Sequence, residues 1–121
     1  MIMDYINTLI FSGCLYNKEC TDSGLYELEY SIDDFSMLLI DYYYKPHDES
    51  QEPGCAKSVM VNVTTLNELY DKGIDYILEL GYGINVANSK IRMTEDKLYV
   101  NYYHNICIYK ITGIRKSGGD E

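Results

Sequence analysis

The sequence predicts an α+β fold in which a mostly antiparallel sheet of five to six strands carries one well-marked helix. Three observations predict this fold. Polar and apolar side chains alternate in several short segments, one segment has helical spacing between a capping box and a glycine, and 121 residues suit a single domain. We therefore expect one domain at residues 1–116, followed by a frayed tail at residues 117–121.

The first segment, residues 4–11, is compatible with either a helix or a strand. Asp4 in the N-cap position and the spacing of Tyr5, Leu9 and Ile10 favour the helix. We therefore expect a short N-terminal helix, with a strand as the alternative.

The next two segments predict a β-hairpin. In residues 25–32 apolar and acidic side chains alternate, which is typical of a half-buried strand with its two glutamates on the solvated face. The dipeptide Asp33-Asp34 favours a turn. Residues 35–45 then form a second strand, whose apolar residues on both faces indicate a central position in the sheet.

A loop, a strand and the clearest helix follow. Residues 46–56 contain both prolines and predict an exposed loop, whereas the alternating valines of residues 57–64 predict a third strand. A helix is expected over residues 66–80, because a capping box opens at Thr65, apolar side chains recur at helical spacing and Gly81 follows as a left-handed stop.

The C-terminal part of the chain predicts a meander of three short strands. These strands are expected at residues 90–94, 97–103 and 106–112, with turns at Glu95-Asp96 and His104-Asn105. A stretch rich in glycine and asparagine separates the meander from the helix.

The net charge of −9 is distributed unevenly along the chain. Residues 1–52 hold 11 acidic residues against Lys18 and Lys45, which gives −9, whereas residues 53–121 hold 8 residues of each sign and are neutral. This asymmetry favours a single acidic face. Nucleic acid and anionic membranes require a basic face, so neither is an expected partner.

The four cysteines are expected to be free thiols, because a domain of this length and apolar content is stable without disulfides. Cys107 lies in an apolar run and is expected to be a buried thiol. Free thiols favour the reducing cytoplasm, and no segment reaches the ~18 apolar residues of a spanning helix. These features predict a soluble cytoplasmic protein.

No motif has a spacing that fixes a reaction. The group formed by His47, Asp48, Glu49, Glu52 and Cys55 matches neither an EF-hand nor a zinc pattern, and we interpret it as a solvated loop. The acidic pairs lie on open faces without a cleft, and the glycines after the predicted helix are misplaced for holding a phosphate. We therefore expect no catalytic residue, no metal site, no cofactor and no enzymatic activity.

The 14 tyrosines leave two interpretations open. They either replace Phe and Trp as the aromatic residues of the core or form an exposed interface, for which tyrosine is well suited. In the strand at residues 35–45, Tyr42 and Tyr44 share one face, whereas Tyr43 lies on the other face with Asp41. The face with Asp41 is expected to be the wetter one, which makes Tyr43 the candidate anchor for a partner.

These features predict a non-enzymatic inhibitor that binds a basic protein, such as a nuclease or another nucleic-acid-binding protein. By analogy, an immunity protein or antitoxin that neutralises a nuclease toxin fits best. One alternative is a phage-type inhibitor that mimics nucleic-acid charge and blocks a host defence nuclease, as anti-CRISPR proteins do. Another is a small-molecule-binding or enzymatic domain that uses tyrosine hydroxyls. The predicted partner-binding residues are Glu27, Glu29, Asp33, Asp34, Asp41 and Tyr43.

Overall fold

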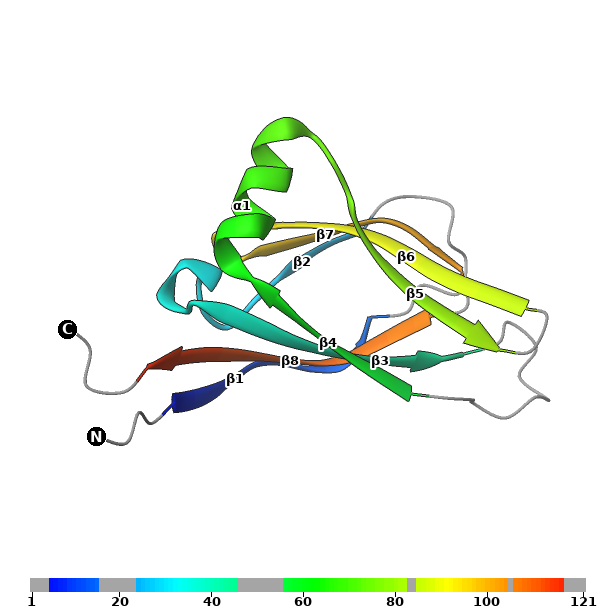
Figure 1. Ribbon diagram of the computed structural model, residues 1–121, viewed down its shortest axis with the longest axis horizontal. Helices are drawn as coiled ribbons and strands as arrows, with labels where there is room; N and C mark the ends of the chain where they lie inside the picture. Colours follow the sequence, from blue (N-terminus) through cyan, green and yellow to red (C-terminus); the bar gives the residue numbers. More distant parts are fainter. Residues whose placement is uncertain (1–4, 16–23, 46–55, 83–84, 105, 117–121) are drawn as a thin grey trace.

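The computed structural model describes residues 5–15, 24–45, 56–82, 85–104 and 106–116, and it confirms an α+β fold (Figure 1). The strands form two antiparallel sheets of four strands each, where the sequence predicted one sheet of five to six. Sheet I has the order β1-β8-β3-β4 and sheet II the order β2-β7-β6-β5.

The bounds of the elements are as follows. Sheet I contains β1 (Tyr5–Leu15), β8 (Ile106–Lys116), β3 (Met37–Tyr44) and β4 (Ala56–Asn62). Sheet II contains β2 (Gly24–Glu27), β7 (Lys97–His104), β6 (Asn85–Thr94) and β5 (Tyr76–Tyr82). The short 3₁₀ turn η1 (Ile32–Asp34) precedes β3, and the helix α1 (Val63–Lys72) connects β4 to β5.

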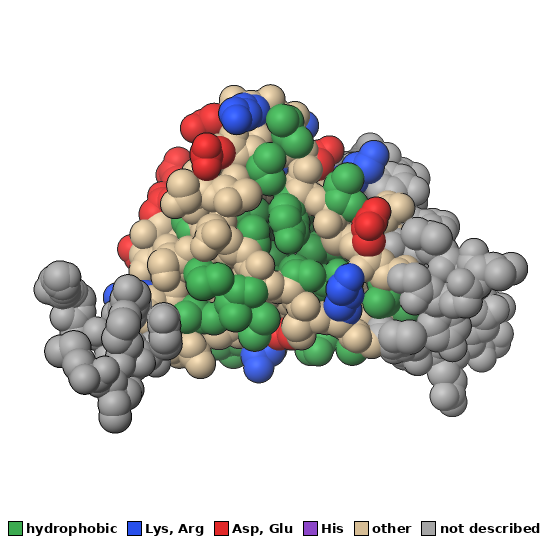
Figure 2. Space-filling model, viewed as in Figure 1, with side chains coloured by type: hydrophobic (Ala, Val, Ile, Leu, Met, Phe, Trp, Pro, Cys, Tyr) green, Lys and Arg blue, Asp and Glu red, His purple; other side chains and the backbone are tan. Residues whose placement is uncertain are grey.

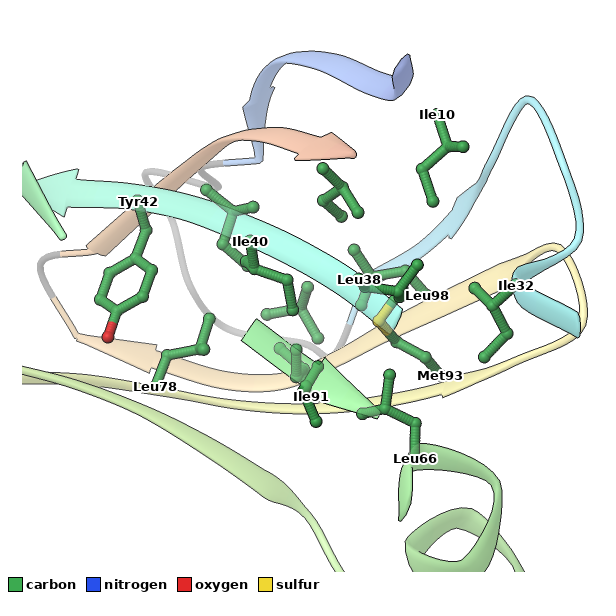
Figure 3. Packing of buried hydrophobic residues seen from close by; sticks show 14 of the residues in the cluster. Ile10, Ile32, Leu38, Ile40, Tyr42, Leu66, Leu78, Ile91, Met93 and Leu98 are labelled. Atoms are coloured by element: carbon green, nitrogen blue, oxygen red, sulfur yellow. The ribbon is translucent and has the colours of Figure 1, made fainter. Parts of the chain in front are cut away.

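The core lies between the two sheets, as the close view in Figure 3 shows. Alternate residues of β3 point inward, and Leu38, Ile40 and Tyr42 are fully buried. They meet side chains from sheet II, including Leu78 and Ile91. A single sheet would leave one of its apolar faces in water, whereas two facing sheets bury both inner faces.

The expected hairpin between residues 25–32 and 35–45 is wrong. β2 pairs with β7 in sheet II, whereas β3 lies in sheet I between β8 and β4. The central position expected for β3 is confirmed. The chain changes sheets at η1, where Ser31 accepts a hydrogen bond from the Asp33 N–H at 3.2 Å and so begins the 3₁₀ turn.

The expected N-terminal helix is also wrong, because the described part of this segment belongs to strand β1. β1 pairs antiparallel with β8, from Tyr5 opposite Lys116 to Leu15 opposite Ile108. Ile10 is fully buried at an irregularity in this ladder, whereas Leu9 is exposed. Neighbouring residues therefore point to opposite sides, as in a strand. Pairing with β8 gives the backbone of this segment stable hydrogen bonds, whereas an isolated helix of this length would be only marginally stable.

Helix α1 is shorter than the predicted helix over residues 66–80. It ends at Gly73, whose φ of 70° is left-handed and whose N–H donates to the Tyr70 carbonyl at 3.0 Å. Beyond it, Leu78 and Leu80 are buried on β5 while Ile77 is exposed, so the pattern there is the alternation of a strand. The glycine that stops the helix is therefore Gly73, and not Gly81 as predicted.

All three predicted C-terminal strands are present as β6, β7 and β8. The turn at Glu95-Asp96 joins β6 to β7 as predicted, with Glu95 in a left-handed conformation at φ 51°. The meander stops there, because β8 crosses into sheet I and pairs with β1 and β3. The third strand therefore lies in the sheet opposite the other two.

The expectation of a free thiol at Cys107 is wrong, because this fully buried cysteine is disulfide-bonded. The side chains of Cys14, Cys20 and Cys55 lie outside the described residues. A buried cysteine in an apolar run packs equally well as a thiol or as half of a disulfide, so the sequence context did not distinguish the two.

The disulfide of Cys107 is expected to stabilise the fold. A disulfide contributes about 2 to 4 kcal/mol to the free energy of unfolding, so a reducing agent should lower the thermal midpoint by several degrees. The Cys107→Ala variant should show a lowered midpoint without a reductant. Calorimetry with and without the reductant provides the measurement, and equal midpoints in all three samples would contradict the disulfide.

Gly113 on β8 lies directly under the ring of Phe35. A Cβ atom at position 113 would lie 2.6 Å from Cγ, Cδ1 and Cδ2 of that ring. We expect Gly113→Ala to lower the free energy of unfolding by about 1 to 3 kcal/mol, because the ring must leave its buried place. The double variant Gly113→Ala/Phe35→Leu, measured by urea denaturation, should recover part of the loss. A single variant as stable as the native chain would refute the contact.

Candidate functional site

The predicted acidic dipeptide Asp33-Asp34 forms the exposed end of η1. Several hydrogen bonds hold it in place. The Phe35 N–H donates to the Ile32 carbonyl at 3.1 Å, and Asn67 Nδ2 of α1 donates to Asp33 Oδ1 at 2.8 Å. Both carboxylates are therefore presented to solvent on a segment that is tied to the helix.

The β6–β7 turn lies against the same segment. The Leu28 N–H donates to the Asp96 carbonyl at 2.7 Å, and the Ile32 N–H donates to the Glu95 carbonyl at 2.8 Å. These two bonds bring the exposed Glu29 and the acidic dipeptide of η1 close to the turn. The turn adds two carboxylates of its own to this end of the molecule.

We call this region the acidic end. Its members are Glu27, Glu29, Asp33, Asp34, Glu95 and Asp96. In Figure 2 acidic side chains follow the flank of the molecule that descends from α1. Four of the six predicted partner-binding residues therefore lie together, and the structure adds Glu95 and Asp96. The sequence predicted these two residues as a turn, and a turn of two adjacent acids at a hairpin tip was the available signal for an exposed charged site.

One cation lies within the acidic end. Lys97 is opposite Glu27 in the β2–β7 ladder, and its Nζ lies 3.4 Å from Asp96 Oδ1. The charge of Asp96, helped by a hydrogen bond to it, raises the pKa of Lys97. About half of each side chain is exposed, so this ion pair contributes little to stability.

Asp41 does not belong to this group, and its expected exposure is wrong. It lies on the outer face of sheet I and is only 8% exposed. Its carboxylate accepts a hydrogen bond from Ser58 Oγ on the neighbouring strand β4, and its register partner on the other side is Lys110 on β8. Cross-strand neighbours cover Asp41, because β3 is a central strand with a partner on each side.

Tyr43 also lies on the outer face of sheet I, away from the acidic end. The predicted facing is confirmed, since Tyr42 and Tyr44 are buried and Tyr43 is the more accessible of the three. Tyr43 is nevertheless half-buried, and its ring centroid lies 5.6 Å from that of Tyr109. Tyr43 is near the end of β3 that lies away from η1.

The other tyrosine hydroxyls were candidates for a small-molecule site. The Tyr42 hydroxyl donates a hydrogen bond to the Glu79 carbonyl at 2.9 Å, and burial raises the pKa of Tyr42. The rings of Tyr70 on α1 and Tyr99 on β7 lie 6.0 Å apart, and the charge of Tyr99, with a hydrogen bond to it, raises the pKa of Tyr70. These hydroxyls thus serve contacts within the protein.

The described residues form neither a metal-ligand cluster nor a membrane-spanning helix. Among the residues that the structure describes, His, Cys, Asp and Glu form no group of three or more with the geometry to hold a metal ion. The polar loop with His47, Asp48, Glu49, Glu52 and Cys55 lies outside the described residues. Within the described ranges, α1 is too short and too polar to cross a membrane.

Comparison with known proteins adds no family to this picture. No family model matches the chain, and no curated protein matches it. The acidic end is therefore interpreted from its geometry and charge alone.

Substitutions at Tyr43 test whether its ring is packed on the outer face of sheet I. We expect Tyr43→Ala to lower the free energy of unfolding by about 1 to 2 kcal/mol, because it loses a half-buried ring and its contact with Tyr109. Tyr43→Phe, which keeps the ring, should retain the native stability. Chemical denaturation of both variants is the measurement, and an unchanged stability of Tyr43→Ala would show a freely exposed ring.

Proposed function

We propose that this protein is a non-enzymatic inhibitor that binds a basic protein through its acidic end. The observation that supports the proposal is the grouping of six carboxylates from three segments, β2 with its bend, η1 and the β6–β7 turn, at one end of the molecule. Such a grouping attracts a positively charged partner and orients it during the encounter.

The backbone contacts of the acidic end support a protein partner further. Asp33 and Asp34 sit on a capped 3₁₀ turn, and Glu95 and Asp96 sit on a tight hairpin turn that bonds the same segment. Because the carboxylates are held by the backbone of the fold, little conformational entropy is lost when a partner binds them. Rigid presentation of charge suits an inhibitor that must occupy a preformed basic site.

Nucleases are the class of partner that fits this chemistry best. A nuclease is positively charged where it binds the phosphates of its substrate, and a rigid set of carboxylates can occupy that site. We therefore favour an immunity protein or antitoxin that acts on a nuclease toxin. Mimicry of nucleic-acid charge against a host defence nuclease uses the same surface, and it is the second candidate for that reason.

The test measures association of the full chain with a panel of basic nucleases at low and high salt. Asp34→Asn/Glu95→Gln removes two charges from the acidic end, while Asp71→Asn/Glu79→Gln removes two exposed charges elsewhere. The first variant should slow association by about tenfold at low salt and by much less at high salt, because salt screens the charges. The second variant should change the rate little.

The outcomes separate the candidate functions. Tight inhibition of one nuclease supports an immunity protein, whereas similar inhibition of several unrelated nucleases supports mimicry of nucleic-acid charge. Equal on-rates for the two variants at low salt would place the interface away from the acidic end. A panel in which nothing binds would refute the inhibitor proposal.

A further inference from the structure

Two open sheets have four edge strands, and an edge strand exposes backbone groups that can pair with another chain. Three of the four edges carry a feature that limits pairing. β2 is only four residues long. On β1 the Ile10 carbonyl accepts a hydrogen bond from the Glu29 N–H at 3.2 Å. On β5 the Glu79 carbonyl accepts the Tyr42 hydroxyl at 2.9 Å.

β4 is the edge without such protection among the described residues. β4 has seven residues and is an edge strand of sheet I. In the described ranges its partner strand is β3 alone. Its sequence has no proline and a single charged residue, Lys57. Five of the seven side chains are exposed, and Met60 is 50% exposed. Figure 2 shows hydrophobic side chains gathered around the position that β4 has in Figure 1.

We propose that β4 pairs antiparallel with β4 of a second copy of this chain. The contact joins the two copies of sheet I into one continuous sheet of eight strands, with hydrogen bonds between the outward-facing backbone groups of both β4 strands. The arrangement has two-fold symmetry, which closes the assembly at a dimer. β4 itself contains no member of the acidic end, so the proposal does not rest on the proposed function.

The charges of the chain favour a second copy as the occupant. Lys57 lies near the N-terminal end of β4, whereas η1 lies near the C-terminal end, because Asn62 is opposite Met37 and Asp34 precedes Met37 by three residues. Antiparallel pairing therefore brings Lys57 of each copy toward the acidic dipeptide of the other. Parallel pairing would instead place Lys57 beside Lys57 and both acidic ends together.

The outer face of sheet I offers a matched pair of variants. Leu9 on β1 and Met60 on β4 belong to the same row of register partners, in which Leu9 is opposite Thr112, Thr112 opposite Leu39 and Leu39 opposite Met60. Their exposed fractions are nearly equal, at 51% and 50%. Met60→Lys places a charge on the proposed interface, and Leu9→Lys places the same charge on the opposite edge.

Sedimentation equilibrium of the full chain, from low to high micromolar concentration, tests the proposal. The native chain should approach twice its 14.0 kDa mass. Met60→Lys should weaken the dimer by about tenfold or more, whereas Leu9→Lys should leave it unchanged. Circular dichroism melts establish that both variants are folded. A native chain that stays at the monomer mass overturns the proposal, and so does equal weakening by the two variants, since that places the contact on the sheet face.

A charge exchange tests the direction of the strands. Lys57→Glu should weaken the dimer several-fold, because it faces the acidic dipeptide of the other copy, and Lys57→Glu/Asp34→Lys should restore the dimer. A single variant that dimerises like the native chain, or a double variant that is weaker than Lys57→Glu, refutes antiparallel pairing. Hydrogen exchange of the β4 amides should slow as the concentration rises, and exchange independent of concentration counts against the edge contact.

Discussion

The inward face of β3 is the constraint on which the rest of the structure depends. Leu38, Ile40 and Tyr42 are fully buried there, and the Tyr42 hydroxyl reaches the backbone of β5 in the other sheet. An aromatic ring with a polar tip can fill the space between two sheets and still satisfy its hydroxyl group. Because β3 has strand partners on both sides, these residues fix the place of β8 and β4 as well as the distance to sheet II.

Periodicity predicted the strands well and the boundary of the helix poorly. Short apolar patterns identified β3, β4, β6, β7 and β8. Their described inner residues are mostly buried, but Asp41 on β3 and Cys107 on β8 are buried on the outer face of sheet I as well. Ile77 and Leu80 fitted both a helical stripe and a strand, since short apolar patterns satisfy either period. What decides between them is Gly73, whose left-handed conformation ends α1. The prediction instead placed Gly73 inside the helix and took Gly81 as the stop.

The pairing of strands was harder to predict than the strands themselves. β2 and β3 are neighbours in the sequence and lie in different sheets, and β8 leaves the meander to pair with β1. Such choices depend on contacts between distant segments, which a local pattern does not contain. The acidic end shows the same limit. Composition predicted that Glu29 and Asp33 are exposed, but two backbone hydrogen bonds to residues 95 and 96 bring the second acidic pair beside them. Asp41 carries the same charge as Asp33 and lies only a few residues further along the chain, yet it is buried because β3 is a central strand.

The packing of Phe35 over Gly113 connects the interior of the protein to the position of η1 on its surface. Phe35 follows Asp34 directly, and the Ser36 N–H and Oγ both donate to the Ile114 carbonyl, at 3.0 and 3.1 Å. The location of two surface charges is therefore set by an interior position that has no side chain. A mutation far from any partner can alter recognition by moving η1, so a screen for altered affinity will recover interior substitutions alongside those on the surface.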